Sequence, residues 1–483
     1  MPRLLRRLHL PMLLVSAAAG AQPVGDALDA RALAGFFDGA VPPLMSEHRV
    51  PGAVVAVVAG GEVRLLQGFG AAQLDPERRA TPDTPFATGS VAKLFVWTSV
   101  MQLVERGELD LDADVNDYLD FAIPATFDQP ITLQHLLTHT PGFEDRPLIG
   151  LFFDDLGRMR SLREALVRNL PARLRPPGEE TAYSNYGSAL AGYIIERVSG
   201  MPYDVYVDRR VLTPLGMTRS SLRRELPPEL AFEAAVGYTP EGQTGYRAHG
   251  REYMELYPAG AMVMSAGDAA QFMVAYLGDG AAETGRILQP ATVTQMRGTL
   301  FTNLPGLPGN AYGFWEGAAH GERILGHDGD TMRFHTKLAL LPERGVGLYL
   351  ATNAPGGVKL RAELWEAFLD RFYPATPVAL AQDGMPMTRY AGLYGSNRVA
   401  ATTAGKVAAL FQNLAVQVDD DALVTVRGEE RRWLPQGGGV FADAEREGAE
   451  LVFRDDGGLM AVYVGEAPME VYRRLRWFER PTF

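Results

Sequence analysis

The chain has 483 residues, a net charge of −12 at pH 7, and no cysteine. This length exceeds one ordinary hydrophobic core and predicts two domains. The acidic balance argues against a nucleic-acid partner. The absence of cysteine excludes disulfides, thiolate metal sites and a cysteine nucleophile.

Residues 1–21 are typical of a cleavable export signal. Three arginines within the first seven residues precede a short apolar stretch from His9 to Ala19, and Ala19-Gly20-Ala21 fits a small-x-small cleavage site. The apolar stretch is too short to span a bilayer comfortably. We therefore expect a periplasmic or secreted protein; a frayed N-terminal helix is the alternative. We expect no transmembrane segment in the rest of the chain.

The first predicted elements are a helix and a hairpin. Residues 27–48 have the periodicity of an amphipathic helix, and residues 54–66 form two apolar runs around Gly60-Gly61. A strongly apolar helix follows and is expected to stop at Gly107. From about 110 to 300 the pattern is mainly helical.

Strand patterns return at 338–350 as a second hairpin, and a helix is expected at about 358–372. Strands at both ends of a helical middle predict an α+β domain over residues 27–374, with an antiparallel sheet and a helical subdomain. Residues 373–377 resemble a linker. Alternating strands after it predict a small all-β domain, a barrel or a sandwich, over residues 386–483.

Ser90-Val91-Ala92-Lys93 begins the apolar helix. A serine and a lysine three positions apart on a helix share one face, with Cβ atoms about 5–6 Å apart. A buried lysine is costly without a task or a partner. If burial or neighbouring cations suppress its charge, it can take the serine's proton. Chance matches to S-x-x-K are common, so this pattern alone is weak.

Two later segments carry candidate partners. In Tyr183-Ser184-Asn185, the tyrosine hydroxyl could relay protons, with a pKa that falls when cations favour the phenolate, and the amide could bind both a lysine and a substrate. The alternative is a core tyrosine and a helix-capping asparagine. In Gly326-His327-Asp328-Gly329-Asp330, glycine lets a substrate backbone approach a sheet edge; the alternative is a plain turn.

The ordered set S-x-x-K, Y-x-N and H-x-G resembles the serine β-lactamase and penicillin-binding-protein superfamily, above all its class C β-lactamase and family VIII esterase branch. Supporting matches are Leu136-Leu137-Thr138-His139-Thr140-Pro141-Gly142, Pro258-Ala259-Gly260-Ala261-Met262 and Tyr312-Gly313-Phe314-Trp315. The resemblance covers about residues 30–372. It implies a β-lactamase-like transpeptidase fold, and the β domain resembles the lipocalin-like or barrel appendages of many members.

The resemblance also implies roles. Ser90 would be the acylated nucleophile, Lys93 its base, and Tyr183 the proton shuttle for the leaving group and the deacylating water. Asn185, His327 and Gly329 would position substrate, and the N–H groups of Ser90 and Asp330 would form the oxyanion hole. No metal or cofactor is implied.

The chain departs from the family where many β-lactamases carry K-T-G, because His327-Asp328-Gly329 stands there. A permanent cation at this place typically grips a β-lactam carboxylate. A histidine is mostly neutral above about pH 6.5, and the flanking Asp328 and Asp330 would repel an anion. We therefore expect a weak β-lactamase and favour an esterase or a peptidase/amidase.

Two other functions stay open. A D-aminopeptidase-type or prodrug-cleaving peptidase would use the aspartates to hold an ammonium group. A slow-acylating penicillin-binding or sensing module would use the β domain to contact a partner. The expected partner is a small-molecule or peptide substrate; membrane association would require the natural chain to continue past Phe483.

Two further features have structural interpretations. His135 and His139 lie four positions apart, but Leu136 stands where a zinc-protease helix needs glutamate, so a helix end is favoured over a metal site. Residues 152–155 are expected to form either a lid or wall of the site, or a loop packed on the body.

Overall fold

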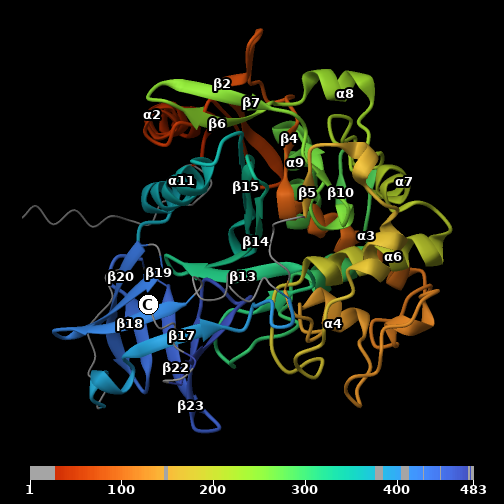
Figure 1. Ribbon diagram of the computed structural model, residues 1–483. Coiled ribbons are helices and arrows are strands. Elements are labelled where there is room, and N and C mark those ends of the chain that lie inside the picture. The colour runs from red at the N-terminus through yellow and green to blue at the C-terminus, as the bar shows by residue number, and fades with distance from the viewer. Residues whose placement is uncertain are drawn as a thin grey trace, which may run out of the picture.

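The computed structural model describes residues 28–145, 151–375, 385–403, 413–427, 429–446, 448–476 and 479. The expected export signal and most of the expected linker lie outside these residues. The described chain forms a large mixed helix-and-sheet unit and a strand-built unit beside it (Figure 1). Within the described residues, no helix has the length and apolar character needed to cross a membrane.

The large unit is built on an eight-stranded antiparallel sheet in which β1 pairs with both β2 and β16. In sheet order the strands are β12 (Asn310–Ala311), β13 (Phe314–Ala319), β14 (Glu322–Asp330), β15 (His335–Leu341), β16 (Val346–Thr352), β1 (Gly52–Ala59), β2 (Glu62–Leu74) and β3 (Glu77–Arg79). The pairing of β1 with β16 joins distant parts of the chain, which confirms the predicted α+β sheet.

Both faces of the sheet are covered, because every residue of β1 is buried. Val55 and Val57 pack with α2 (Ala30–Glu47) and α11 (Gly357–Phe372). Val54 and Ala56 point to the opposite face, into the core shared with α9 (Ala266–Leu277) and α3 (Lys93–Glu105). The alternation of side chains along a strand thus connects two hydrophobic cores through one sheet.

The helical side holds the remaining helices and short strand pairs. The helices are α4 (Leu133–Leu137), α5 (Leu162–Arg168), α6 (Asn185–Ser199), α7 (Tyr203–Val207), α8 (Pro228–Glu233) and α10 (Pro290–Met296). The strand pairs are β4 (Phe86–Ala87) with β9 (Val263–Met264), β5 (Phe152–Phe153) with β8 (Tyr253–Met254), β6 (Gly237–Glu241) with β7 (Gly245–His249), and β10 (Ala281–Ala282) with β11 (Gly285–Arg286).

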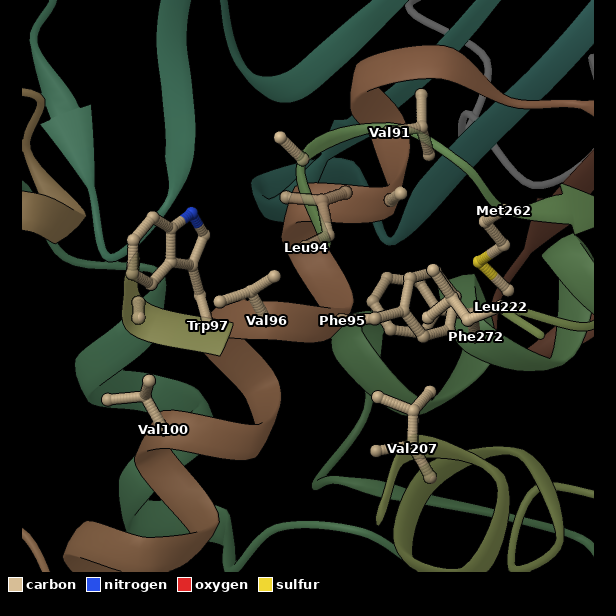
Figure 2. Packing of buried hydrophobic residues seen from close by; sticks show 14 of the residues in the cluster. Val91, Leu94, Phe95, Val96, Trp97, Val100, Val207, Leu222, Met262 and Phe272 are labelled. Carbon is tan, nitrogen blue, oxygen red and sulfur yellow. The ribbon is translucent and has the colours of Figure 1, made fainter. Parts of the chain in front are cut away.

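Helix α3 runs through the centre of this side and is buried on all faces from Lys93 to Leu103. Figure 2 shows the apolar side chains around its first turns, among them Phe95 beside Phe272. These two rings stack with centroids 4.6 Å apart. Such packing fixes the start of α3, and the residues just before it, relative to the sheet.

The second unit is a closed antiparallel barrel, which settles the expected choice between barrel and sandwich. Its strands are β17 (Gly392–Ser396), β18 (Leu414–Asp419), β19 (Ala422–Arg427), β20 (Glu429–Gly437), β21 (Val440–Asp443), β22 (Glu450–Asp456), β23 (Leu459–Val464) and β24 (Val471–Arg474). Tyr394, Trp433, Phe441 and Phe453 fill its interior. Side chains occupy small barrels in this way because alternate residues of every strand point inward.

The barrel docks on the large unit through specific hydrogen bonds. Asn397 Nδ2 donates to the carbonyl of Thr181 at 2.8 Å, and Arg473 pairs with Glu180 at 2.7 Å. The backbone N–H of Tyr183 donates to the carbonyl of Met469 at 3.3 Å. The barrel therefore holds the segment that contains the predicted site tyrosine.

Candidate active site

Ser90 lies in a 3-10 turn, Gly89–Ala92, and Lys93 is the first residue of α3. The two residues were expected on one regular helix; the tighter turn instead places Ser90 just ahead of it. Gly89 has φ 52°, and a Cβ on Gly89 would lie 2.5 Å from the backbone nitrogen of Asp330. Glycine is required there, since another residue would be strained and would push β14 away.

The ε-amino group of Lys93 is fully buried and lies 3.0 Å from Ser90 Oγ. It donates to Asn185 Oδ1 at 2.8 Å and to the carbonyl of Ala259 at 2.5 Å. A neutral amine has two N–H groups and one lone pair. With both N–H groups committed to carbonyl oxygens, the lone pair faces the hydroxyl of Ser90.

Burial holds the pKa of Lys93 well below its usual 10.5. The Arg398 guanidinium adds to this effect on the pKa, while Asp145 opposes it. The cost of desolvating an ammonium group favours the neutral form, which is the form that accepts a proton. The predicted Ser90–Lys93 pair is thus present, and the lowered pKa of Lys93 suits it to act as the base.

The Tyr183 ring lies near two basic side chains, 4.9 Å from Lys93 Nζ and 4.7 Å from Arg398 Cζ. Burial nevertheless raises the pKa of Tyr183 above 10, while Ser90 and Arg398 act in the opposite direction. The expectation that cations would lower this pKa is therefore wrong, because desolvation of the phenolate outweighs them. Tyr183 is a neutral phenol, able to donate a proton.

His139 supports Tyr183, which was not predicted from the sequence. Helix α4 ends at Leu137, and His139 has φ 55°, so His139 and His135 do not share a helix face. The His139 ring lies 4.6 Å from the Tyr183 ring, and its Nδ1 accepts from the backbone N–H of Ser184 at 3.1 Å. The T-H-T-P-G motif marks His139 in the sequence, but its contact with Tyr183 could not be predicted because the two residues are far apart in the chain.

The backbone geometry leaves an N–H free at the end of β14. Thr331 N donates to the carbonyl of Phe334, and β14 pairs with β15 so that Asp330 faces His335. Because hydrogen-bonded pairs alternate along an antiparallel ladder, the N–H of Asp330 points away from β15. A Cβ on Gly329 would lie 3.0 Å from Ser90 N, so the two backbone nitrogens are near neighbours, as an oxyanion hole requires.

His327 lies within β14 and not in a turn, so the glycine-turn alternative is wrong. Burial lowers the pKa of His327 to about 3, and the charge of Lys93 adds to the effect. Its ring stacks on Trp315 at 4.7 Å, and Nδ1 lies 2.6 Å from the carbonyl of Asp328. His327 is therefore neutral, as expected from the sequence, and over a wider pH range.

The two aspartates are paired with cations, contrary to the expectation that they act as free anions. Asp328 lies 2.8 Å from Lys337 Nζ, and Asp330 contacts Arg361 at 2.7 Å and His335 Nδ1 at 2.7 Å. Burial acts to raise the pKa of Asp330, but the hydrogen bond from His335 and the charge of Arg361 outweigh it and lower this pKa to about 2. The side chain of Asp330 is thus held by these partners, while its backbone N–H is left to the site.

These groups line a cavity of about 320 Å³. Ser90, Tyr183, Asn185, His327 and Asp330 contribute from the large unit. An apolar wall of this cavity consists of Leu151, Phe152 and Met254. Phe152 therefore lies in a wall of the site, which is one of the two alternatives predicted for residues 152–155. The barrel supplies Arg398, Glu466, Ala467, Met469 and Glu470. Sequence reasoning did not predict this barrel wall.

Among the described residues, one group has metal-ligand spacing: Glu47, His48 and Glu363. His48 Nε2 lies 2.9 Å from a carboxylate oxygen of Glu363, which gives the cluster an internal ion pair. The cluster joins α2 to α11 and is not part of the cavity that contains Ser90.

Comparison with known proteins agrees with this geometry. The family model described as Beta-lactamase matches residues 37–371. Penicillin-binding protein 4 of Amycolatopsis lactamdurans is 32% identical over 332 residues, which cover 65% of this chain and 83% of that protein. Esterase EstB of Burkholderia gladioli is 37% identical over 213 residues, 41% of this chain and 54% of EstB.

Among solved structures, the crystal structure of SurE with D-Leu has a TM-score of 0.62 and 25% identity. That match covers 92% of this chain and 99% of SurE, so it extends beyond the family model's residues into the barrel. Three observations indicate the same family: the buried lysine beside a serine, the two adjacent backbone N–H groups, and the family match over most of the large unit. The chain belongs to the β-lactamase family of serine hydrolases, which relates it to penicillin-binding proteins and esterases.

Proposed function

We propose that the protein is an exported hydrolase that forms an acyl-enzyme at Ser90 and acts on carboxylic esters. The observation that carries the proposal is the buried Lys93 amine, whose donors are occupied by Asn185 and Ala259 while Ser90 Oγ lies 3.0 Å away. The N-terminal signal pattern supports the export part of the proposal.

In the proposed reaction, Ser90 Oγ attacks the ester carbonyl carbon as Lys93 Nζ takes the hydroxyl proton. The N–H groups of Ser90 and Asp330 stabilise the oxyanion, an effect worth about 2.7–4 kcal/mol per donor. The C–O bond to the alcohol breaks, Tyr183 donates a proton to the leaving oxygen, and Lys93 returns one to Tyr183. Water then attacks the acyl-Ser90 ester, and the carboxylic acid leaves.

The surroundings of Gly329 favour esters over β-lactam antibiotics. His327 is neutral, and the nearby cations Lys337 and Arg361 are bound to Asp328 and Asp330. A β-lactam carboxylate would therefore meet no uncommitted cation on this strand. Efficient β-lactam hydrolysis is not part of the proposal.

A second candidate is a peptidase or amidase. The structure of SurE, which matches both units of this chain, was solved with D-Leu, and this favours a peptide-derived acyl or acceptor group. The aminopeptidase variant of this candidate is less favoured, because the aspartates expected to hold an ammonium group are bound to Arg361 and Lys337.

Incubation with a fluorophosphonate, followed by intact mass, tests the proposal. We expect a single adduct in the wild type, none in Ser90→Ala, and an unchanged adduct in Ser46→Ala, an exposed serine on α2. Chromogenic ester and amide substrates with one acyl group then separate the two candidates. Rapid Ser90-dependent turnover of the ester supports the esterase; a persistent acyl mass without turnover shows slow deacylation and indicates a penicillin-binding or sensing module.

A further inference from the structure

A second cavity of about 530 Å³ adjoins the catalytic cavity. Phe152, Met254 and Gly260 line both cavities. Phe152 and Met254 face each other in the β5–β8 pair, so this ribbon forms the shared wall. A Cβ on Gly260 would lie 3.5 Å from the backbone of Gly89, the residue before the nucleophile.

The position of this second cavity relates it to the acyl part of a substrate. Its lining includes Thr331, the residue after Asp330, and Ala87, close before Gly89. The carbonyl carbon of a bound ester must lie between Ser90 Oγ and the N–H groups of Ser90 and Asp330. A group attached to that carbon is therefore delivered beside the wall that Phe152, Met254 and Gly260 form.

Most of the lining is apolar. It consists of Pro85, Ala87, Phe152, Leu226, Pro228, Ala231, Ala234, Ala235, Val236, Met254, Ala261, Val263 and Phe334, with the ring of Tyr253 beside them. Burying methylene groups against such a wall is favourable, because it removes apolar surface from water. The cavity therefore suits a methylene chain.

One cation in this lining, Arg251, has no anionic partner among the described residues. The Arg251 guanidinium donates to the carbonyl of Arg223 at 3.1 Å and lies 5.5 Å from the centroid of the Tyr253 ring. Within the described residues, no carboxylate pairs with it. Burial lowers its pKa to about 10, which leaves it charged at neutral pH.

The other charged groups of the cavity do not replace that partner. Glu252 is bound to Arg333 at 2.7 Å, and Glu225 lies on the exposed rim. His249 Nε2 lies 2.7 Å from Thr239 Oγ1. A half-buried cation in an apolar wall is costly unless an anion joins it, and a guanidinium matches a carboxylate with two parallel hydrogen bonds.

We propose that this second cavity is an acyl-binding pocket for a methylene chain that carries a terminal carboxylate, which Arg251 binds. The proposal rests on the proposed function and names its substrate class: esters of long-chain dicarboxylic acids or of comparable apolar acyl groups with a distal carboxylate.

The test compares p-nitrophenyl monoesters of adipic, suberic and sebacic acid with the same compounds capped as distal methyl esters. We expect the free distal carboxylate to raise kcat/KM about 10- to 100-fold for the chain length that reaches Arg251. Arg251→Met should remove this preference, so that charged and capped esters have the same kcat/KM. Arg251→Lys should keep part of it, and Arg247→Met, an exposed arginine on β7, should keep all of it.

A wild-type enzyme with equal kcat/KM for charged and capped esters would overturn the pocket assignment while leaving the esterase proposal intact. So would a preference that survives in Arg251→Met. If no ester acylates Ser90, the proposed function fails, and the pocket is tested by titrating suberate into Ser90→Ala. Binding that Arg251→Met abolishes supports the pocket even then, and absence of binding overturns it.

Discussion

Burial of Lys93 is unfavourable for its charged form and favourable for its proposed role as a base. Full burial of an amine raises the free energy of its charged form, and this same penalty produces the neutral base beside Ser90. The stem packs in the core that surrounds α3, and the three oxygen atoms around Nζ fix its orientation. The stability of the folded protein and the proton affinity of Lys93 are therefore linked.

The acidic limb of the pH–rate profile should depend on Arg398. This cation lowers the pKa of Lys93, and Asp145 raises it. In Arg398→Met we expect the limb of kcat/KM that reports Lys93 to move to higher pH, because a cation that lowers the pKa of Lys93 is lost. Asp145→Asn should move it to lower pH, and Arg432→Met, on β20 and paired with Asp419, should not move it. Equal profiles in all variants would show that Arg398 has no electrostatic role.

Stability should also depend on pH through Lys93. Its pKa in the folded state lies below 10.5, so the unfolded state binds the extra proton between the two values, and stability rises with pH in that window. We expect the melting temperature of wild type minus that of Lys93→Met to increase as the pH rises toward 10.5. Calorimetry measures it; a constant difference would mean that Lys93 stays charged in the folded protein.

The order of the motifs allowed Ser90, Lys93, Tyr183 and Asn185 to be predicted as a set, because each motif is local. The pKa of Tyr183 was predicted in the wrong direction, since nearby cations can be inferred from a motif and the degree of burial cannot. Arg398 and His139 act through contacts with Tyr183 that depend on tertiary structure. No local pattern marks such partners.

At the scale of elements, the site depends on how closely β14 passes the 3-10 turn. A Cβ on Gly329 would lie 1.9 Å from the carbonyl of Thr88, so these two backbones are in direct contact. Thr336 Oγ1 also donates to that carbonyl at 2.7 Å and ties β15 to the same turn. The distance between the N–H groups of Ser90 and Asp330 therefore follows from the sheet.

Gly329→Ala should separate β14 from the turn and weaken oxyanion binding. We expect kcat for ester hydrolysis to fall about 100- to 1,000-fold, the effect of losing one donor. The control is Gly317→Ala on β13, where a Cβ would meet its nearest neighbour at 3.9 Å. Stopped-flow acylation with circular dichroism measures both rate and folding. A folded Gly329→Ala enzyme with normal kcat would rule out this role for the contact.

Alternating apolar patterns correctly predicted the hairpins β1–β2 and β15–β16 and the helix α11, since each is stabilised by neighbours in sequence. Residues 326–330 were ambiguous because two glycines in a strand look like a turn. Their extended form is imposed by pairing with β15 on one side and by the Gly89 turn on the other. Closure of the barrel likewise depends on β17 pairing with β24, far apart in sequence.

For the whole molecule, the interface between the two units is part of the catalytic cavity. The Glu180 side chain is 6% exposed and is shared by Arg473 of the barrel and Arg175 of the large unit. Two residues on from Thr181, the amide of Tyr183 is held by the carbonyl of Met469. Loss of docking should therefore affect stability and activity together.

Glu180→Ala should reduce the coupling of the two units. Removing this carboxylate leaves Arg473 and Arg175 without their shared partner. The free energy of unfolding should fall by about 1–2 kcal/mol, a figure reduced because Arg473 is partly exposed to solvent. We expect one calorimetric transition in the wild type and an earlier barrel transition in Glu180→Ala, with activity lost at the earlier one. Glu179→Ala, its exposed neighbour, should behave as wild type. A single unshifted transition in Glu180→Ala would contradict the coupling.

The contact between Met469 and Tyr183 also relates the completion of the site to the order in which the chain is translated. The ribosome adds Ser90 and Lys93 early, but it adds Arg398 and Met469 only after the whole large unit has been made. A nascent chain thus holds a nucleophile and a base whose tyrosine still lacks its cation and its backbone anchor. The proposed acyl transfer therefore depends on residues that are translated after the large unit, so we expect activity only after the barrel has folded and docked.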